Sequence, residues 1–156
     1  MLERHRMKYQ YQLVRINKQN YPLFNDMLFW RETGFERVAL QNSVSKSIKK
    51  ELKNKNLYVY AVEIENRFVG WISLVYIPKI SKWKNGGHLY VDELWIAPAF
   101  RGLGLAKILM NQAESLQKKL GAVGIRLYVN TENETAKGLY SACGYKENGN
   151  AVFMDK

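Results

Sequence analysis

The chain has 156 residues, and 24 Lys or Arg against 14 Asp or Glu give it a formal net charge of +10. That length is typical of one domain, so we expect a single domain over 1–156. No apolar run approaches the roughly 18 residues of a membrane span, and the first residues lack the apolar core of a secretory signal. With Cys143 as the one cysteine, no internal disulfide can form, and we expect a cytoplasmic protein without a membrane partner.

The strongest concentration of lysines is the run 45–56, SKSIKKELKNKN. Val44, Ile48 and Leu52 recur there every four residues, which predicts a short helix whose lysines lie on the opposite, solvated face. A nucleic-acid patch is the alternative interpretation. No interleaved aromatic residues or known nucleic-acid motif supports it, so a nucleic-acid partner is not expected. The excess charge would also attract a small anionic ligand.

Hydrophobic periodicity and turn residues predict alternating strands and helices in the first half of the chain. In chain order these are a strand over 9–16, an apolar helix bracketed by Pro22 and Gly34, the Lys-rich helix, and strands 57–64 and 67–77 around a Glu65-Asn66 turn. The helix also carries the aromatic residues Tyr21, Phe24, Phe29 and Trp30. They are either core residues or an apolar, cation-stacking wall of a ligand site.

The second half begins with a strand over 88–98 that stops at Pro98. The clearest helix signal follows over 102–120, because leucine and alanine recur in one stripe and Gly121 ends it. The remaining predicted elements are a strand over 123–130, a helix with capping-box spacing at Thr131 and Glu134 that Gly144 ends, and a last strand within 150–156. This order predicts an α/β fold with a mixed sheet.

The segment 101–106, Arg-Gly-Leu-Gly-Leu-Ala, places two glycines between a strand and the start of the long helix. The first amides of a helix have no internal acceptor and carry partial positive charge, so a bare backbone there can receive a pyrophosphate. The alternative is that Gly102 and Gly104 only make a tight turn. A dinucleotide fingerprint would need a third glycine where Lys107 stands, and the Walker lysine pattern is absent.

Three linked segments together resemble a known family: LYVDELWIAPAFRGLGLAKILM (89–110), YVNTENETAKGLYSACGY (128–145) and the hairpin EIENRFVGWISL. They are similar to the GNAT superfamily of N-acetyltransferases, which transfer acetyl from acetyl-CoA to amines, with some likeness to the polyamine acetyltransferase branch. The resemblance implies a mixed, mostly antiparallel central sheet of six to seven strands flanked by about four helices. It also implies acetyl-CoA as cosubstrate, and we expect no metal.

Carried over by position, the resemblance assigns cofactor-binding roles to three stretches. The backbone of Leu94, Trp95 and Ile96 would pair with the pantetheine arm like an added strand. The second stretch would hold the pyrophosphate through its backbone amides, with countercharge from Arg101 and Lys107, and comprises Arg101, Gly102, Leu103, Gly104, Leu105, Ala106 and Lys107. On the next helix, Asn133 would contact the arm, and Ala136 belongs to the same matching pattern.

The chemistry requires a base, because an amine with a pKa near 10.4 is protonated at pH 7 and deprotonating it costs about 4.6 kcal/mol. Asp92 and Glu93 lie midway along the predicted strand, and alternation sends them to opposite faces. We favour Asp92, acting through water, and keep Glu93 as the alternative; either could instead be a surface carboxylate. The resemblance makes Tyr140 the general acid for the leaving thiolate, unless it is only a core tyrosine.

The acceptor stays open among a polyamine, another small amine and a protein amino group. A chain of charge +10 repels a polycation unless its pocket is acidic. Two other functions also remain: a regulatory protein that binds acetyl-CoA without catalysis, and a basic nucleic-acid-associated module. An exposed terminal strand would make a homodimer possible.

Overall fold

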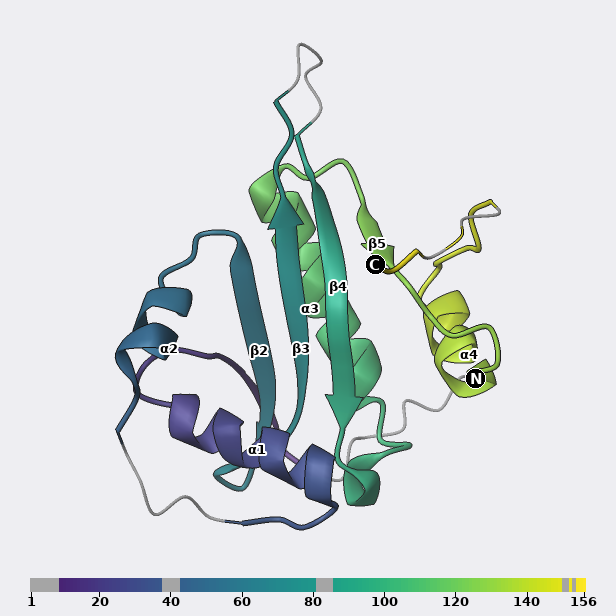
Figure 1. Ribbon diagram of the computed structural model, residues 1–156. Helices are drawn as coiled ribbons and strands as arrows, with labels where there is room; N and C mark the ends of the chain where they lie inside the picture. The colour runs from purple at the N-terminus through teal and green to yellow at the C-terminus, as the bar shows by residue number, and fades with distance from the viewer. Residues whose placement is uncertain (1–8, 38–42, 81–85, 150–151, 153) are drawn as a thin grey trace.

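The computed structural model describes residues 9–37, 43–80, 86–149, 152 and 154–156. One sheet runs through it in the order β1-β2-β3-β4-β5, with helices on both faces (Figure 1). The strands are β1 (Gln12–Arg15), β2 (Leu57–Ile64), β3 (Arg67–Ile77), β4 (His88–Ile96) and β5 (Ile125–Leu127). The helices are α1 (Tyr21–Thr33), α2 (Lys46–Glu51), α3 (Leu105–Leu120) and α4 (Glu134–Ala142), with a short 3-10 turn η1 (Pro98–Phe100) before α3.

The sheet is mixed and mostly antiparallel, as predicted: β1 to β4 pair antiparallel, and β5 joins β4 in parallel. Glu65 and Asn66 both have left-handed φ values, 51° and 61°, which suit the tight turn of a twisted hairpin. The predicted count of six to seven strands is wrong for the described residues, which hold five. In the expected last strand, residues 152 and 154–156 are not in a strand, and the others lie outside the described residues.

Helix α3 covers one face of the sheet, behind β3 and β4 in Figure 1. Its predicted stripe is confirmed, because Leu105, Leu109, Ala113 and Leu116 are buried against the sheet in one hydrophobic cluster. Each fully buried leucine contributes about 1.5–3 kcal/mol to folding. The position of the N-terminus of α3 relative to β4 is therefore fixed by a well-packed core.

Helix α1 lies on the opposite face and packs a second, aromatic cluster. Trp71 of β3 is fully buried there, and the ring of Phe24 meets it edge-on with centroids 5.6 Å apart. The predicted helix bounds are confirmed. Pro22 lies in the first turn, and Gly34, at a left-handed φ of 77°, donates its N–H to the carbonyl of Trp30.

Several element ends differ from the sequence prediction. The first strand is confined to Gln12–Arg15 and the fifth to Ile125–Leu127, so both are shorter than predicted. Helix α3 begins at Leu105 rather than residue 102, because the glycine loop before it is not helical. Helix α4 is capped by Asn133, whose Oδ1 accepts from Ala136 N at 3.0 Å, and not by Thr131.

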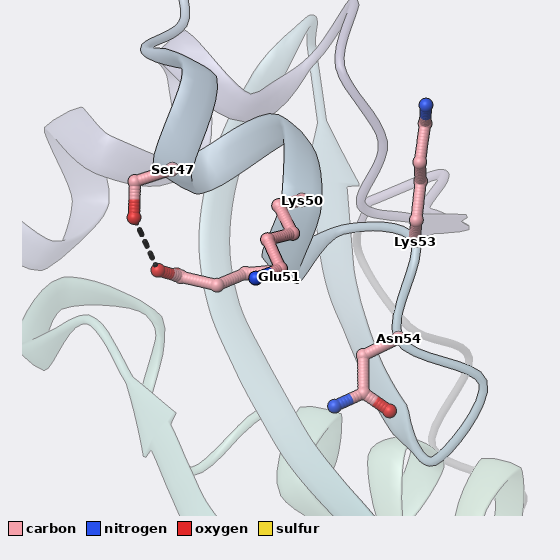
Figure 2. A pocket seen from close by; sticks show the side chains of 5 residues that line it. All are labelled: Ser47, Lys50, Glu51, Lys53 and Asn54. Carbon is pink, nitrogen blue, oxygen red and sulfur yellow. Dashed lines mark hydrogen bonds between the residues drawn. The ribbon is translucent and has the colours of Figure 1, made fainter.

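The Lys-rich helix is confirmed as α2, a helix of six residues capped by Ser45. Val44, Ile48 and Leu52 are half-buried, and the lysines of α2 are exposed, as the four-residue spacing predicts. A hollow of about 500 Å³ lies beside α2, and the residues that line it, drawn as sticks in Figure 2, are Ser47, Lys50, Glu51, Lys53 and Asn54. None of the predicted site residues lines this hollow.

Within the described residues, no helix has the length and apolar character needed to cross a membrane.

Candidate active site

The centre of β4 carries a β-bulge at Asp92. Glu93 lies opposite Ser73 and Val91 lies opposite Leu74, so Asp92 is the extra residue without a partner on β3. Bulges bend a strand and re-aim its side chains. The bulge therefore removes the simple alternation on which the expectation of opposite faces for Asp92 and Glu93 was based.

The bulge coincides with the point where β4 and β5 separate. Their parallel pairing covers only Leu89, Val91 and the residue between them, and the last partner on β5 is Leu127. Beyond Val91, no described strand pairs with the outer edge of β4. In Figure 1, β5 and α4 both lie on this side of β4, away from β3. The protein thus has a fork between two strands, with Asp92 at its apex.

The open edge of β4 presents particular backbone groups. Ala97 donates its N–H to the carbonyl of Val69 at 2.8 Å, so the carbonyl on the same trans peptide, that of Ile96, points away from β3. Antiparallel alternation then turns the N–H and C=O of Leu94 and Ile96 outward and leaves those of Trp95 to β3. Arg101 Nε donates to the outward carbonyl of Ile96 at 3.0 Å. Of the three predicted edge residues, two therefore offer hydrogen-bonding groups at the fork.

The glycine loop follows directly from this edge through η1. Gly102 and Gly104 have left-handed φ values of 75° and 79°, a backbone conformation that favours glycine. This conformation is compatible both with a pyrophosphate-binding loop and with a simple tight turn. A Cβ built on either glycine would meet no atom within 4 Å. The backbone surface is therefore open, and the amides of Leu105, Ala106 and Lys107 in the first turn of α3 have no intrahelical acceptor. This surface fits an anionic group such as a pyrophosphate.

The two acidic residues differ in their partners. Glu93 Oε1 accepts a hydrogen bond from Arg31 Nη1 of α1 at 2.7 Å, and the Arg31 guanidinium lies 5.2 Å from the centre of the Trp71 ring. Asp92 is exposed, and no described side chain forms a hydrogen bond or ion pair with it. Glu93 is thus an anchored, compensated carboxylate, whereas Asp92 is available to a ligand.

An aromatic pair joins β4 to the end of β5. The rings of Tyr90, on β4, and Tyr128, just after β5, lie 5.7 Å apart at the apex of the fork. Burial raises the pKa of Tyr90 above its ordinary value, and the Asp92 carboxylate and Tyr128 add to the shift. Because Tyr90 and Glu93 face Val75 and Ser73 of β3, they lie on the same face of the sheet as Trp71 and α1. Neither tyrosine was among the predicted site residues.

Tyr140 lies on α4, half-buried against the α3 core, with its ring 6.2 Å from that of Tyr145. Burial raises the pKa of the Tyr140 hydroxyl, and Cys143 adds to the shift, so this phenol stays protonated at neutral pH. Burial, with Glu114 as the next cause, raises the pKa of Tyr145 to about 12. A protonated phenol is what a general acid requires, and partial burial also agrees with a packing role.

Asn133 and Ala136 are brought together at the first turn of α4 by the capping hydrogen bond. The bond engages the side-chain oxygen of Asn133, so its amide nitrogen is the group left for a ligand.

The described residues contain no group of three or more His, Cys, Asp or Glu that could hold a metal ion.

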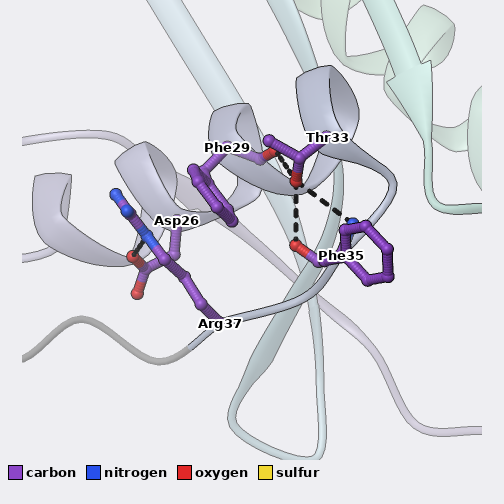
Figure 3. Close-up of polar contacts among 5 residues, drawn as sticks. All are labelled: Asp26, Phe29, Thr33, Phe35 and Arg37. Carbon is purple, nitrogen blue, oxygen red and sulfur yellow. Dashed lines mark hydrogen bonds and ion pairs between the residues drawn. The ribbon is translucent and has the colours of Figure 1, made fainter.

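The aromatic residues of α1 make packing contacts within the protein. Phe24 is core, whereas Trp30 packs on Trp95 of β4 with centroids 5.8 Å apart. Phe29 belongs to a polar cluster shown in Figure 3, where Arg37 lies 4.0 Å from its ring centre and bonds the buried Asp26 through Nε at 3.2 Å. That cluster fastens the segment after α1 to the helix and contains none of the predicted catalytic or cofactor-binding residues.

The open strand edge offers unpaired backbone groups to an extended ligand, and the glycine loop offers helix amides to an anionic one. The chain belongs to the acetyltransferase (GNAT) family, whose model matches residues 18–145. It is an acetyl-CoA-dependent N-acetyltransferase, and acetyl-CoA is its cosubstrate.

Individual relatives agree with this assignment. The chain is 29% identical over 113 residues to a thialysine N-epsilon-acetyltransferase of Caenorhabditis elegans, covering 71% of this chain and 68% of the relative. It is 32% identical over 63 residues, 40% of each chain, to an uncharacterized N-acetyltransferase of Mycobacterium bovis.

Solved structures share the fold at lower identity. An aminoglycoside acetyltransferase from an uncultured soil metagenomic sample, in complex with trehalose, superposes with a TM-score of 0.76 at 16% identity, covering 94% of this chain and 95% of that one. An aminoglycoside N-acetyltransferase in complex with CoA gives a TM-score of 0.75 at 15% identity, covering 95% of each chain.

Proposed function

We propose that the protein acetylates a primary amine of a small molecule at the fork between β4 and β5, by direct attack of the amine on acetyl-CoA. The observation that carries this proposal is the bulge at Asp92 where the two strands part, with an unpaired backbone edge leading to an open glycine loop. Its relatives include proteins named for thialysine and for aminoglycosides, both of which are amines.

In this proposal, the cosubstrate lies along the open edge. The outward C=O of Leu94 and the outward N–H and C=O of Ile96 bind the pantetheine arm, and Trp95 fixes this edge by its pairing with β3. The amides of Gly102 through Lys107 hold the pyrophosphate, helped by the positive charges of Arg101 and Lys107. Asn133 and Ala136 border the arm from α4. When the ligand binds, Arg101 either replaces its hydrogen bond to the carbonyl of Ile96 with one to the ligand or makes both hydrogen bonds.

The chemical step joins the amine nitrogen to the acetyl carbon and breaks the carbon–sulfur bond. The outward N–H of Leu94 polarises the acetyl carbonyl, as a preorganised donor does for a developing oxyanion. The amine proton leaves through water to Asp92, which is exposed at the apex. Glu93, which accepts a hydrogen bond from Arg31, is the second candidate base. The thiolate of CoA takes a proton from Tyr140, and the second proton that the nitrogen loses as the amide forms returns to the Tyr140 phenolate through water.

The test is a screen of primary amines for acetyl-CoA-dependent thiol release, combined with calorimetry of CoA binding. We expect CoA to bind and at least one small amine to be acetylated. CoA binding without turnover on any amine would instead favour the regulatory alternative. RNA binding with a steep dependence on salt would favour the nucleic-acid alternative.

A further inference from the structure

The charges at the apex of the fork restrict which amine can be the acceptor. This inference rests on the proposed function and deepens it. Asp92 and Glu93 are adjacent in the chain, and of these two acids only Glu93 pairs with Arg31, through a hydrogen bond of 2.7 Å; Arg31 also reaches Glu32, at 4.0 Å. Among the described side chains, no cation pairs with Asp92. On β5, the residue beside Tyr90 is Arg126, which is exposed and adds positive charge. Of the two adjacent acids on β4, Asp92 is therefore the carboxylate without a paired cation that faces the acceptor.

The rings of Tyr90 and Tyr128 add an aromatic surface that favours an organic ammonium group. Tyr90 is half-buried and Tyr128 is 71% exposed, with their rings 5.7 Å apart. A cation near the face of an aromatic ring is stabilised by the ring quadrupole, more so where water is excluded. Asp92 follows Tyr90 by two residues on β4 and is the extra residue of the bulge.

We propose that the acceptor is a primary amine carrying a single positive charge, whose ammonium group binds Asp92 against the rings of Tyr90 and Tyr128. A diamine or polyamine brings a second ammonium group to a site where Arg31 has already neutralised the second carboxylate. That group meets the surrounding positive charge of the chain, which is +10 overall. The binding of polycations is disfavoured for this physical reason.

The test compares n-butylamine with 1,4-diaminobutane, two acceptors of equal carbon number that differ by one charge at neutral pH. We expect kcat/KM, counted per amino group, to be higher for butylamine. R31Q should release Glu93 and raise the diamine-to-monoamine ratio about fivefold, which corresponds to about 1 kcal/mol. R31K keeps the positive charge and should retain the wild-type ratio.

R67Q is the matched control, because Arg67 also pairs with a glutamate, Glu36, through Nη2 at 2.6 Å. Arg67 lies six residues from Ser73 along β3, or about 20 Å from the bulge, at ~3.3 Å per residue. Its loss changes net charge by the same amount, so the acceptor ratio should not change. A wild-type preference for the diamine, or an R31Q ratio equal to that of R67Q, would overturn the inference.

The aromatic contribution is tested separately. Y128L should raise KM for butylamine about threefold without changing KM for acetyl-CoA, whereas Y128F should resemble the wild type. If neither amine is turned over, butylammonium is titrated into the CoA-bound protein while the Tyr90 and Tyr128 ring resonances are followed by NMR. Ring shifts with no turnover of any amine in the screen would sink the proposed function but keep the ammonium site. An absence of ring shifts, with turnover of another amine, would overturn the ammonium site but leave the proposed function in place.

Discussion

The glycine loop allows backbone strain to be separated from ligand binding. Gly104 and Gly121 cap the two ends of α3 with left-handed φ values of 79° and 64°, and a Cβ on either would meet nothing within 4 Å. A leucine at either position should therefore lower the free energy of unfolding by a similar amount, about 1–2 kcal/mol, because of the backbone conformation alone. Only Gly104 lies in the surface assigned to the pyrophosphate.

We therefore predict that Gly104→Leu weakens CoA binding at least tenfold, about 1.4 kcal/mol, while Gly121→Leu leaves it unchanged. Isothermal titration calorimetry gives the affinity, and urea unfolding gives the stability of both variants. The reasoning is refuted if the two variants lose affinity equally, since strain in α3 would then explain the loss. It is also refuted if Gly104→Leu binds CoA as tightly as the wild type.

Four further predictions address the chemistry and the core. Tyr140→Phe should lower kcat far more than it changes KM for acetyl-CoA in steady-state assays; an unchanged kcat removes its acid role. Asp92→Asn should lower kcat/KM for the amine about 10²-fold, more than Glu93→Gln does, because Arg31 already engages Glu93; the reverse order would make Glu93 the base. Leu109→Ala should cost about 2–5 kcal/mol of stability by urea unfolding, since Leu109 is fully buried in the α3 core; a loss below 1 kcal/mol would contradict that packing. The raised pKa of Tyr145, about 12, means that its stabilising contribution is complete below the unfolded-state pKa near 10 and is lost as pH rises toward 12; Tyr145→Phe should flatten that decline.

Local signals accounted for much of the fold. Gly34 ends α1, the Glu65-Asn66 turn joins β2 to β3, and the stripe of α3 is buried, because each feature is written in a few neighbouring residues. The predicted strand count exceeds that of the described residues because a strand exists only if a partner pairs with it. The segment 123–130 has strand-like composition, yet pairing covers only three of its residues, and residues 152 and 154–156 are not in a strand.

The sequence indicated which elements form the candidate site but not how its charges pair. The glycine loop and the edge of β4 could be read from a motif, and the structure gives them geometry. The bulge at Asp92 has no glycine or proline to signal it, and it depends on register with β3. The pairing of Arg31 with Glu93 spans 62 residues, so no local pattern could have revealed that one of two adjacent acids is already compensated.

The central claim is that acetyl-CoA binds along the open edge of β4. Amide hydrogen exchange with and without CoA tests it most directly, residue by residue. We predict that CoA slows exchange at Leu94 and Ile96, whose N–H groups face the fork, and changes that of Trp95, already bonded to β3, much less. Unchanged exchange at Leu94 and Ile96 in the presence of saturating CoA would contradict the account.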